Sequence, residues 1–175
     1  MKASSSSDPS AHAVGFPPIA APGARILILG SMPGQQSLRA QAYYAHPRNA
    51  FWPIMASLLG FVPEDSYAHR TAMLQQHGIA LWDVLQSCVR PGSLDANIDR
   101  QQLTCNDFAA FLAAYPDITR ICCNGAAAHD LFCRHALPAL QALRPLDVLR
   151  LPSTSPAHAG MSRDAKLQAW RAALS

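Results

Sequence analysis

Lysine, charged side chains and N-terminal apolar runs are all scarce in this chain of 175 residues. Lysine occurs only at Lys2 and Lys166, so arginine supplies nearly all of the positive charge. Charged residues make up 14% and hydrophobic residues 50% of the chain, which argues against disorder and favours a globular fold. Residues 1–23 contain no apolar run long enough for a signal peptide or a membrane span. We therefore expect a cytoplasmic protein without a membrane partner.

The cysteine pattern argues against a disulfide framework and against a metal site. The chain has five cysteines, an odd number, and no C-x-x-C spacing. This pattern is typical of a reduced intracellular protein, and we expect neither a metal nor another cofactor. Cys122 and Cys123 are interpreted as small apolar residues of a strand.

Three common site motifs are absent from the glycine-containing segment Gly30–Gly34. It lacks the G-x-G-x-x-G and G-x-x-x-x-G-K-[ST] spacings, which argues against the usual dinucleotide and P-loop sites. It also lacks G-x-S-x-G, which disfavours a hydrolase nucleophile elbow. The net charge of +3 permits a nucleic-acid partner without requiring one.

The order of apolar and polar segments predicts an α/β fold. We expect strands at 26–29, 79–82, 118–123 and 146–151, and helices at 51–60, 66–77, 107–114, 126–137 and 163–174. Alternating strands and helices indicate a three-layer αβα sandwich around a central, mainly parallel four-stranded sheet. Residues 24–175 form this single domain, and residues 1–23, rich in Ser, Pro and Ala, are expected to be a flexible tail. Residues 88–106 are expected to be irregular.

Polar residues follow the first, third and fourth predicted strands, so they should meet at one edge of the sheet. Each has a structural alternative. The Tyr43-Tyr44 pair offers a face for stacking a planar ring, or it packs the next helix. Asn49 offers a donor and an acceptor, or it caps that helix. Asn124 reads a base edge, or it is a turn residue before Gly125.

Two further segments leave alternatives open. Asp83 is either a general base or the start of a helix capping box, and we favour the cap. Ser153, Ser155 and His158 offer donors for a phosphate backbone. They also allow a Ser–His hydrolase, although no orienting carboxylate marks one.

The order of these segments resembles the uracil-DNA glycosylase superfamily. Residues 28–34 (ILGSMPG) and 44–52 (YAHPRNAFW) are similar to its first conserved region, and residues 151–158 (LPSTSPAH) to its second motif. Residues 123–125 (CNG) resemble the segment between them, and the likeness extends from about residue 24 onward. The combined pattern is most similar to the hypoxanthine-DNA (deoxyinosine) glycosylase branch.

The chain departs from that family at three positions. Met32 replaces the catalytic Asn or Asp that other branches carry in the first loop, whereas Asn49 matches the important Asn of the hypoxanthine branch. Ser153 replaces the histidine that begins the second motif in classical uracil enzymes. Ala157 stands roughly where a wedge leucine is found, so the residue that fills the vacated stack is not identified by the resemblance.

The resemblance implies a monofunctional glycosylase that extrudes a deaminated base, most readily hypoxanthine, and hydrolyses its N-glycosidic bond with water. It implies that Asn49 is catalytic. The implied base-binding residues are Gly30, Ser31, Met32, Pro33, Tyr44, His46 and Asn124, and the implied phosphate-binding residues are Ser153, Thr154, Ser155, Pro156 and His158. The expected partner is damaged DNA, bound by a monomer without an obligate protein partner. Alternatives are a uracil or mismatch-specific glycosylase, and a non-catalytic DNA-binding module of the same fold.

Overall fold

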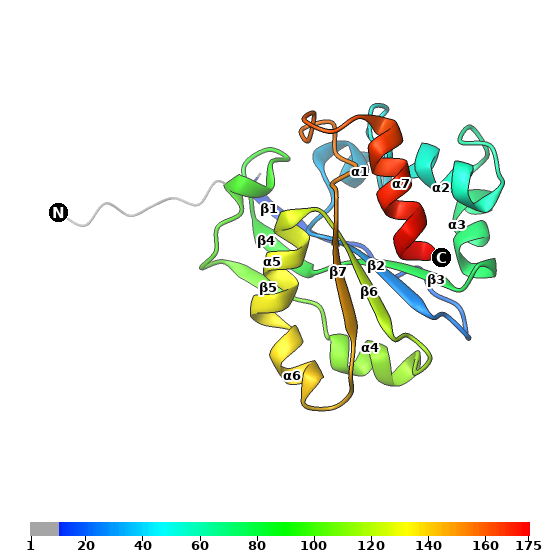
Figure 1. Ribbon diagram of the computed structural model, residues 1–175. Coiled ribbons are helices and arrows are strands. Elements are labelled where there is room, and N and C mark those ends of the chain that lie inside the picture. The colour runs from blue at the N-terminus through cyan, green and yellow to red at the C-terminus, as the bar shows by residue number, and fades with distance from the viewer. Residues whose placement is uncertain (1–10) are drawn as a thin grey trace.

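Four apolar segments form a parallel sheet at the centre of the computed structural model, which describes residues 11–175 (Figure 1). In spatial order they are β3 (Ile79–Asp83), β2 (Ile26–Gly30), β6 (Arg120–Asn124) and β7 (Asp147–Leu151), and each neighbouring pair is parallel. Strands β2, β3 and β6 are largely buried because helices cover both faces, which explains their continuous apolar sequences.

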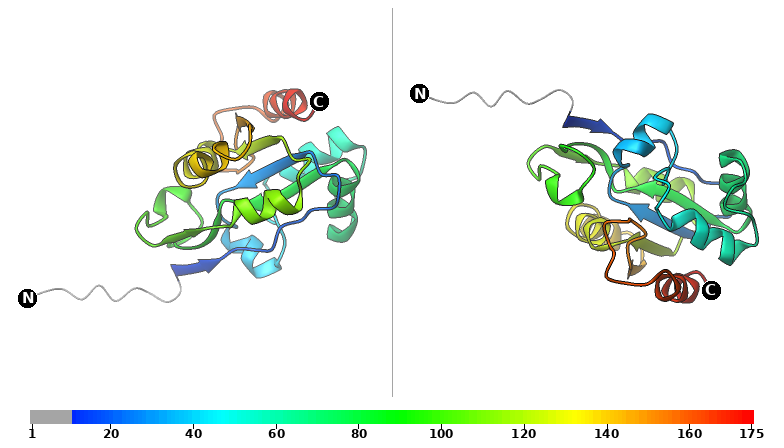
Figure 2. Two further views of the ribbon diagram at one scale, coloured as in Figure 1. Left: turned by 90° about the horizontal axis from the view of Figure 1, so that it is seen from below. Right: turned by 90° about the horizontal axis from the view of Figure 1, so that it is seen from above.

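The helices lie in two layers on opposite faces of this sheet (Figures 1 and 2). They are α1 (Gln35–Ala40), α2 (Phe51–Leu59), α3 (Tyr67–Gln76), α4 (Phe108–Ala114), α5 (Ala126–His135), α6 (Leu137–Gln141) and α7 (Arg163–Leu174). Leu27 of β2 belongs to one core with Phe111 of α4. Its neighbour Ile28 belongs to the other core, with Trp170 of α7. The three-layer αβα prediction is confirmed. No helix within residues 11–175 is long and apolar enough to cross a membrane.

A second, antiparallel sheet was not predicted. It consists of β1 (His12–Val14), β4 (Leu85–Val89) and β5 (Leu103–Cys105), in the order β1-β4-β5. The expectation that residues 88–106 are irregular was therefore wrong at β5 and at the end of β4. Strand β4 pairs with β5 and with β1, which lies far upstream in the chain, and the mixed polar sequence of residues 88–106 does not reveal these pairings.

The expected flexible tail was wrong for residues 11–23, while residues 1–10 lie outside the described part of the chain. Ala13 of β1 is buried against the core. The Tyr43 hydroxyl donates to the Pro17 carbonyl at 2.9 Å, and the Trp82 indole N–H donates to the Phe16 carbonyl at 3.0 Å. Side chains far along the sequence thus fix this segment, and its local composition carries no sign of them.

Most helices end close to the positions that the sequence predicted. Gly60 ends α2 in the left-handed region at φ 78°, as expected of a C-cap glycine. Asp107, and not Asn106, caps α4 by accepting from the Ala110 N–H at 3.0 Å. The favoured cap at Asp83 was wrong, because the chain continues from β3 directly into strand β4.

Candidate active site

The four parallel strands end at one cavity of about 270 Å³. Gly30, Asp83 and Asn124 are the last residues of β2, β3 and β6, and Ser153 follows β7 closely. The chain leaves β2 toward β3 on one side, whereas β6 and β7 lie on the other, so the cavity lies where the strand order reverses. This is the usual ligand-binding position of an open α/β sheet.

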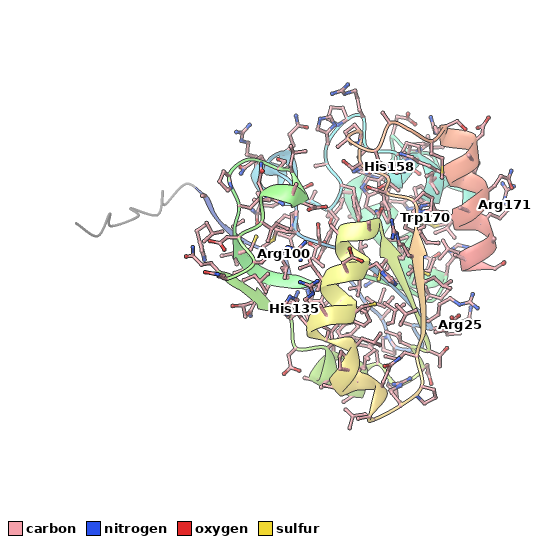
Figure 3. All side chains as sticks on the ribbon, turned by 60° about the vertical axis from the view of Figure 1, so that its left-hand side comes forward. Arg25, Arg100, His135, His158, Trp170 and Arg171 are labelled. Carbon is pink, nitrogen blue, oxygen red and sulfur yellow. The ribbon has the colours of Figure 1, made fainter. Side chains whose placement is uncertain are left out.

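Twelve of the thirteen residues predicted for the site line this cavity: Gly30, Ser31, Met32, Pro33, Tyr44, His46, Asn49, Asn124, Ser153, Thr154, Ser155 and Pro156. His158 does not line it and is exposed on the loop between β7 and α7 (Figure 3). The topology therefore brings together three segments of the chain that the sequence had only placed in order.

A buried arginine holds the loop that follows β2. The Arg90 guanidinium donates to the carbonyls of Met32 at 3.4 Å, Pro33 at 2.5 Å and Gly92 at 3.0 Å. Arg90 itself has no exposed surface. The Ser31 hydroxyl donates to Asp95 Oδ1 at 2.6 Å, which adds a second link between the loop and residues 90–95. The first loop is thus fixed in position before any ligand enters.

Tyr44 adopts an unusual backbone conformation beside the cavity. Its φ of 55° lies in the left-handed region, which is strained for an aromatic residue and is frequent at functional sites. The ring stacks on Phe51, with the ring centroids 4.0 Å apart at an interplanar angle of 24°. Phe51 therefore covers one face of the Tyr44 ring.

One end of the Asn49 carboxamide caps the helix that follows it. Its Oδ1 accepts from the Phe51 N–H at 2.9 Å in the first turn of α2, so the capping interpretation describes this oxygen. The other end, Nδ2, makes no hydrogen bond with the described residues and is not fully buried. Asn49 can therefore present a hydrogen-bond donor to the cavity, whereas its oxygen is occupied.

Asn124 and Thr154 join the ends of β6 and β7. Asn124 Nδ2 donates to Thr154 Oγ1, and the Thr154 N–H donates to Asn124 Oδ1, both at 2.9 Å. Thr154 is only 1% exposed and its carbonyl accepts from the Ala50 N–H at 3.0 Å. The N–H and carbonyl of Thr154 thus bond the protein, while the residue lines the cavity, and its contact with DNA phosphate stays a prediction. Ser153, Ser155 and Pro156 remain partly exposed at the rim.

Two carboxylic acids of the cavity were left out of the predicted site: Asp83 was considered as a general base but interpreted as a helix cap, and Asp95 was missed. Asp83 is 4% exposed, and burial together with the nearby Asp95 raises its pKa, against the opposing Arg90, to about 7. Burial also raises the pKa of Asp95, against the hydrogen bond from Ser31. A signal for Asp83 was present, since it directly follows the apolar residues 79–82 as Asn124 follows its strand. Asp95 lies in a segment without such a signal.

No group of three or more His, Cys, Asp or Glu side chains within residues 11–175 has the arrangement of a metal site. The cysteines of this part of the chain are free thiols. Burial raises the pKa of Cys122 and Cys123 to about 12, consistent with their predicted role as small apolar residues of β6.

The chain is similar in sequence to known proteins of one family. The family model described as the uracil DNA glycosylase superfamily matches residues 17–174. Two curated relatives named hypoxanthine DNA glycosylase are each 36% identical to this chain. The Methanosarcina acetivorans relative aligns over 117 residues, 66% of this chain and 73% of its own length. The Methanosarcina barkeri relative aligns over 115 residues, 63% and 70% respectively.

A solved structure extends the likeness over nearly the whole chain. It is a solution NMR structure from Methanosarcina acetivorans, provisionally described as a uracil DNA glycosylase. It superposes with a TM-score of 0.78 at 31% identity, covering 93% of this chain and 96% of the other. With the cavity at the strand ends and the family match over residues 17–174, this chain belongs to the uracil DNA glycosylase superfamily.

Proposed function

We propose that this protein is a monofunctional DNA glycosylase that releases hypoxanthine from deoxyinosine in damaged DNA. The observation that carries the proposal is the cavity. Residues from all the segments that resemble the family line it, and its volume suits one heterocyclic base. The two curated relatives named hypoxanthine DNA glycosylase support hypoxanthine as the base. A base inside a duplex cannot enter such a cavity, so the nucleotide is extruded first.

In the reaction the bond between C1′ and N9 breaks and its electron pair moves to the base. Water adds its oxygen to C1′, and one proton of that water ends on the released hypoxanthine. The sugar passes through a state with oxocarbenium character, so negative charge develops on the departing base. Catalysis then requires a positioned base, an aligned water and donors that stabilise this charge.

The chain offers a side chain for each of these needs. Tyr44 contacts the base from the wall of the cavity, and Asn49 Nδ2 donates to the base or to the attacking water. Ser153, Ser155 and the exposed His158 contact phosphates next to the lesion. Among residues 11–175 no lysine lines the cavity, and Lys166 donates instead to the His158 carbonyl at 2.7 Å, so these residues supply no amine for a Schiff-base step.

Base release from labelled duplexes tests this proposal. Duplexes that contain deoxyinosine, deoxyuridine or no lesion are incubated with the protein, and alkali then cleaves the abasic product. We expect release of hypoxanthine by the wild-type protein and none by Asn49→Ala. Release of uracil alone would assign the uracil specificity that the NMR relative's description names. Binding of DNA without release of any base would contradict an enzyme and favour a binding module.

A further inference from the structure

Two polar atoms without a protein partner lie at the wall of the cavity. They are Asp83 Oδ2 and Tyr44 Oη, both buried and without a hydrogen bond to the described residues. Burial raises the pKa of the Tyr44 hydroxyl, and Asn124 lies close enough to oppose that rise, but it makes no hydrogen bond of good geometry with the hydroxyl. Because buried polar groups in native proteins are nearly always paired, two orphans beside one cavity indicate polar atoms of a ligand.

Gly30 allows these two groups to approach each other. A Cβ at this position would clash with Asp83 Oδ1 and would lie 3.1 Å from Tyr44 Oη. The acid and the phenol therefore converge on the space above one α-carbon at the end of β2. The left-handed backbone conformation of Tyr44 is a third feature of this arrangement that is frequent at functional sites.

We propose that the Asp83 carboxyl and the Tyr44 hydroxyl together bind the carbonyl oxygen of the extruded base and stabilise the negative charge that forms there. This inference rests on the proposed function. In hypoxanthine the oxygen is attached to C6, and it shares the charge left by the broken bond to C1′. A carbonyl oxygen has two lone pairs, so it accepts from both hydroxyl groups. Neither donor has to give up a competing protein partner.

Asp83 fulfils this role as a neutral carboxylic acid, because only that form is a donor. Burial and the facing Asp95 favour the neutral form, whereas Arg90 opposes it, and the resulting pKa is about 7. Tyr43, Tyr44 and Tyr67 also interact with the acid, and burial raises the pKa of all three further above the neutral range. A protonated acid and a phenol in an apolar site form an effective oxyanion-binding pair.

Single-turnover excision of hypoxanthine over about pH 5.5 to about pH 8 tests the proposal. The wild-type rate should fall above neutrality, to about one-tenth of its plateau near pH 8, as Asp83 ionises. Asp83→Asn keeps an N–H donor that does not titrate, so its rate should stay flat where the wild-type rate falls. His46 also lines the cavity and is present in both proteins, so the difference between the two profiles isolates Asp83.

Removal of each donor should lower the rate without weakening DNA binding. We expect a loss of about 100-fold for Asp83→Leu and of about tenfold or more for Tyr44→Phe. Asp117→Asn, at an exposed carboxylate distant from the cavity lining, is the matched control and should behave as wild type. A rate for Asp83→Leu within threefold of wild type, or an Asp83→Asn profile that still falls as the wild-type profile does, would overturn the inference.

A substrate without the carbonyl oxygen separates this role from a structural one. Deoxynebularine carries purine, which is hypoxanthine without the oxygen on C6. The wild-type protein should release purine about 100-fold more slowly than hypoxanthine, and Asp83→Leu should cause no further loss. Equal losses on both bases would contradict the inference. Failure of the wild-type protein to release hypoxanthine would instead contradict the proposed function itself.

Discussion

Asn124 and Thr154 exchange two hydrogen bonds of 2.9 Å and so connect the carboxyl ends of β6 and β7 beneath the cavity. The pair acts through position, since it fixes the loop that carries Ser153 and Ser155. Asn124 therefore uses both its carboxamide oxygen and its nitrogen in hydrogen bonds to the protein, although the sequence suggested a base-reading residue.

Thr154→Val should destabilise the protein by about 1–3 kcal/mol. The substitution preserves shape but leaves Asn124 Nδ2 without its partner in a half-buried environment. Urea denaturation followed by circular dichroism measures the change. Thr119→Val, at an exposed threonine, is the control and should change the unfolding free energy by less than about 0.5 kcal/mol. A loss no larger than that of the control would show that the link carries no stability.

Asn49→Asp should separate the two ends of the Asn49 carboxamide. The aspartate keeps an oxygen for the Phe51 N–H and adds negative charge at a helix N-terminus, so stability should be unchanged or higher. It loses the Nδ2 donor, so hypoxanthine release should fall by about 100-fold or more. Asn49→Ala should lose both release and about 1 kcal/mol of stability. Full activity of Asn49→Asp would assign catalysis to the oxygen instead.

Asp83→Asn should change how stability depends on pH. The folded pKa of about 7 exceeds the ordinary value of 3.8, so between these values the folded state binds more protons than the unfolded state. The contribution of Asp83 is thus neutral below about pH 4, falls as pH rises, and is most unfavourable above about pH 7. Relative to wild type, the variant should gain on the order of 2–4 kcal/mol between about pH 4 and about pH 8. A difference that is constant with pH in urea titrations would contradict the shift.

Arg90→Met should loosen the first loop. The variant leaves the carbonyls of Met32, Pro33 and Gly92 without their shared donor, which should cost about 2–4 kcal/mol and lower base release. Arg90→Lys keeps the charge but not the fork of donors, so it should restore little. Thermal unfolding and single-turnover excision measure both effects. Arg100→Met, at an exposed arginine (Figure 3), is the control, and a comparable loss there would make the Arg90 result unspecific.

Gly30→Ala should reduce base release by about tenfold or more, because the added methyl group would occupy the space between Asp83 and Tyr44. Excision assays and thermal unfolding measure activity and stability together. Gly160→Ala adds the same methyl group where nothing lies within 4 Å and should leave both unchanged. Normal release by Gly30→Ala would show that the gap between the two side chains is not needed.

The sequence by itself determined the parallel sheet and the place of the cavity. Runs such as Ile26–Leu29 can only be buried on both faces, and parallel strands deliver the residues that follow them to one edge. The helix end at Gly60 and the helix at 163–174 were also predicted correctly, because helix caps and apolar periodicity depend only on residues that are close in sequence. Resemblance to a family added candidate roles for Tyr44 and Asn49 but no geometry.

Only the tertiary structure decided which polar groups are free. Thr154 and Asn124 use their groups on each other, Asp83 enters no helix cap, and Arg90 is buried against carbonyls nearly sixty residues away in sequence. Strand β1 forms because β4 supplies its partner, about 75 residues downstream. Burial and hydrogen bonding depend on neighbours that are distant along the chain, and such neighbours leave no local pattern in the sequence.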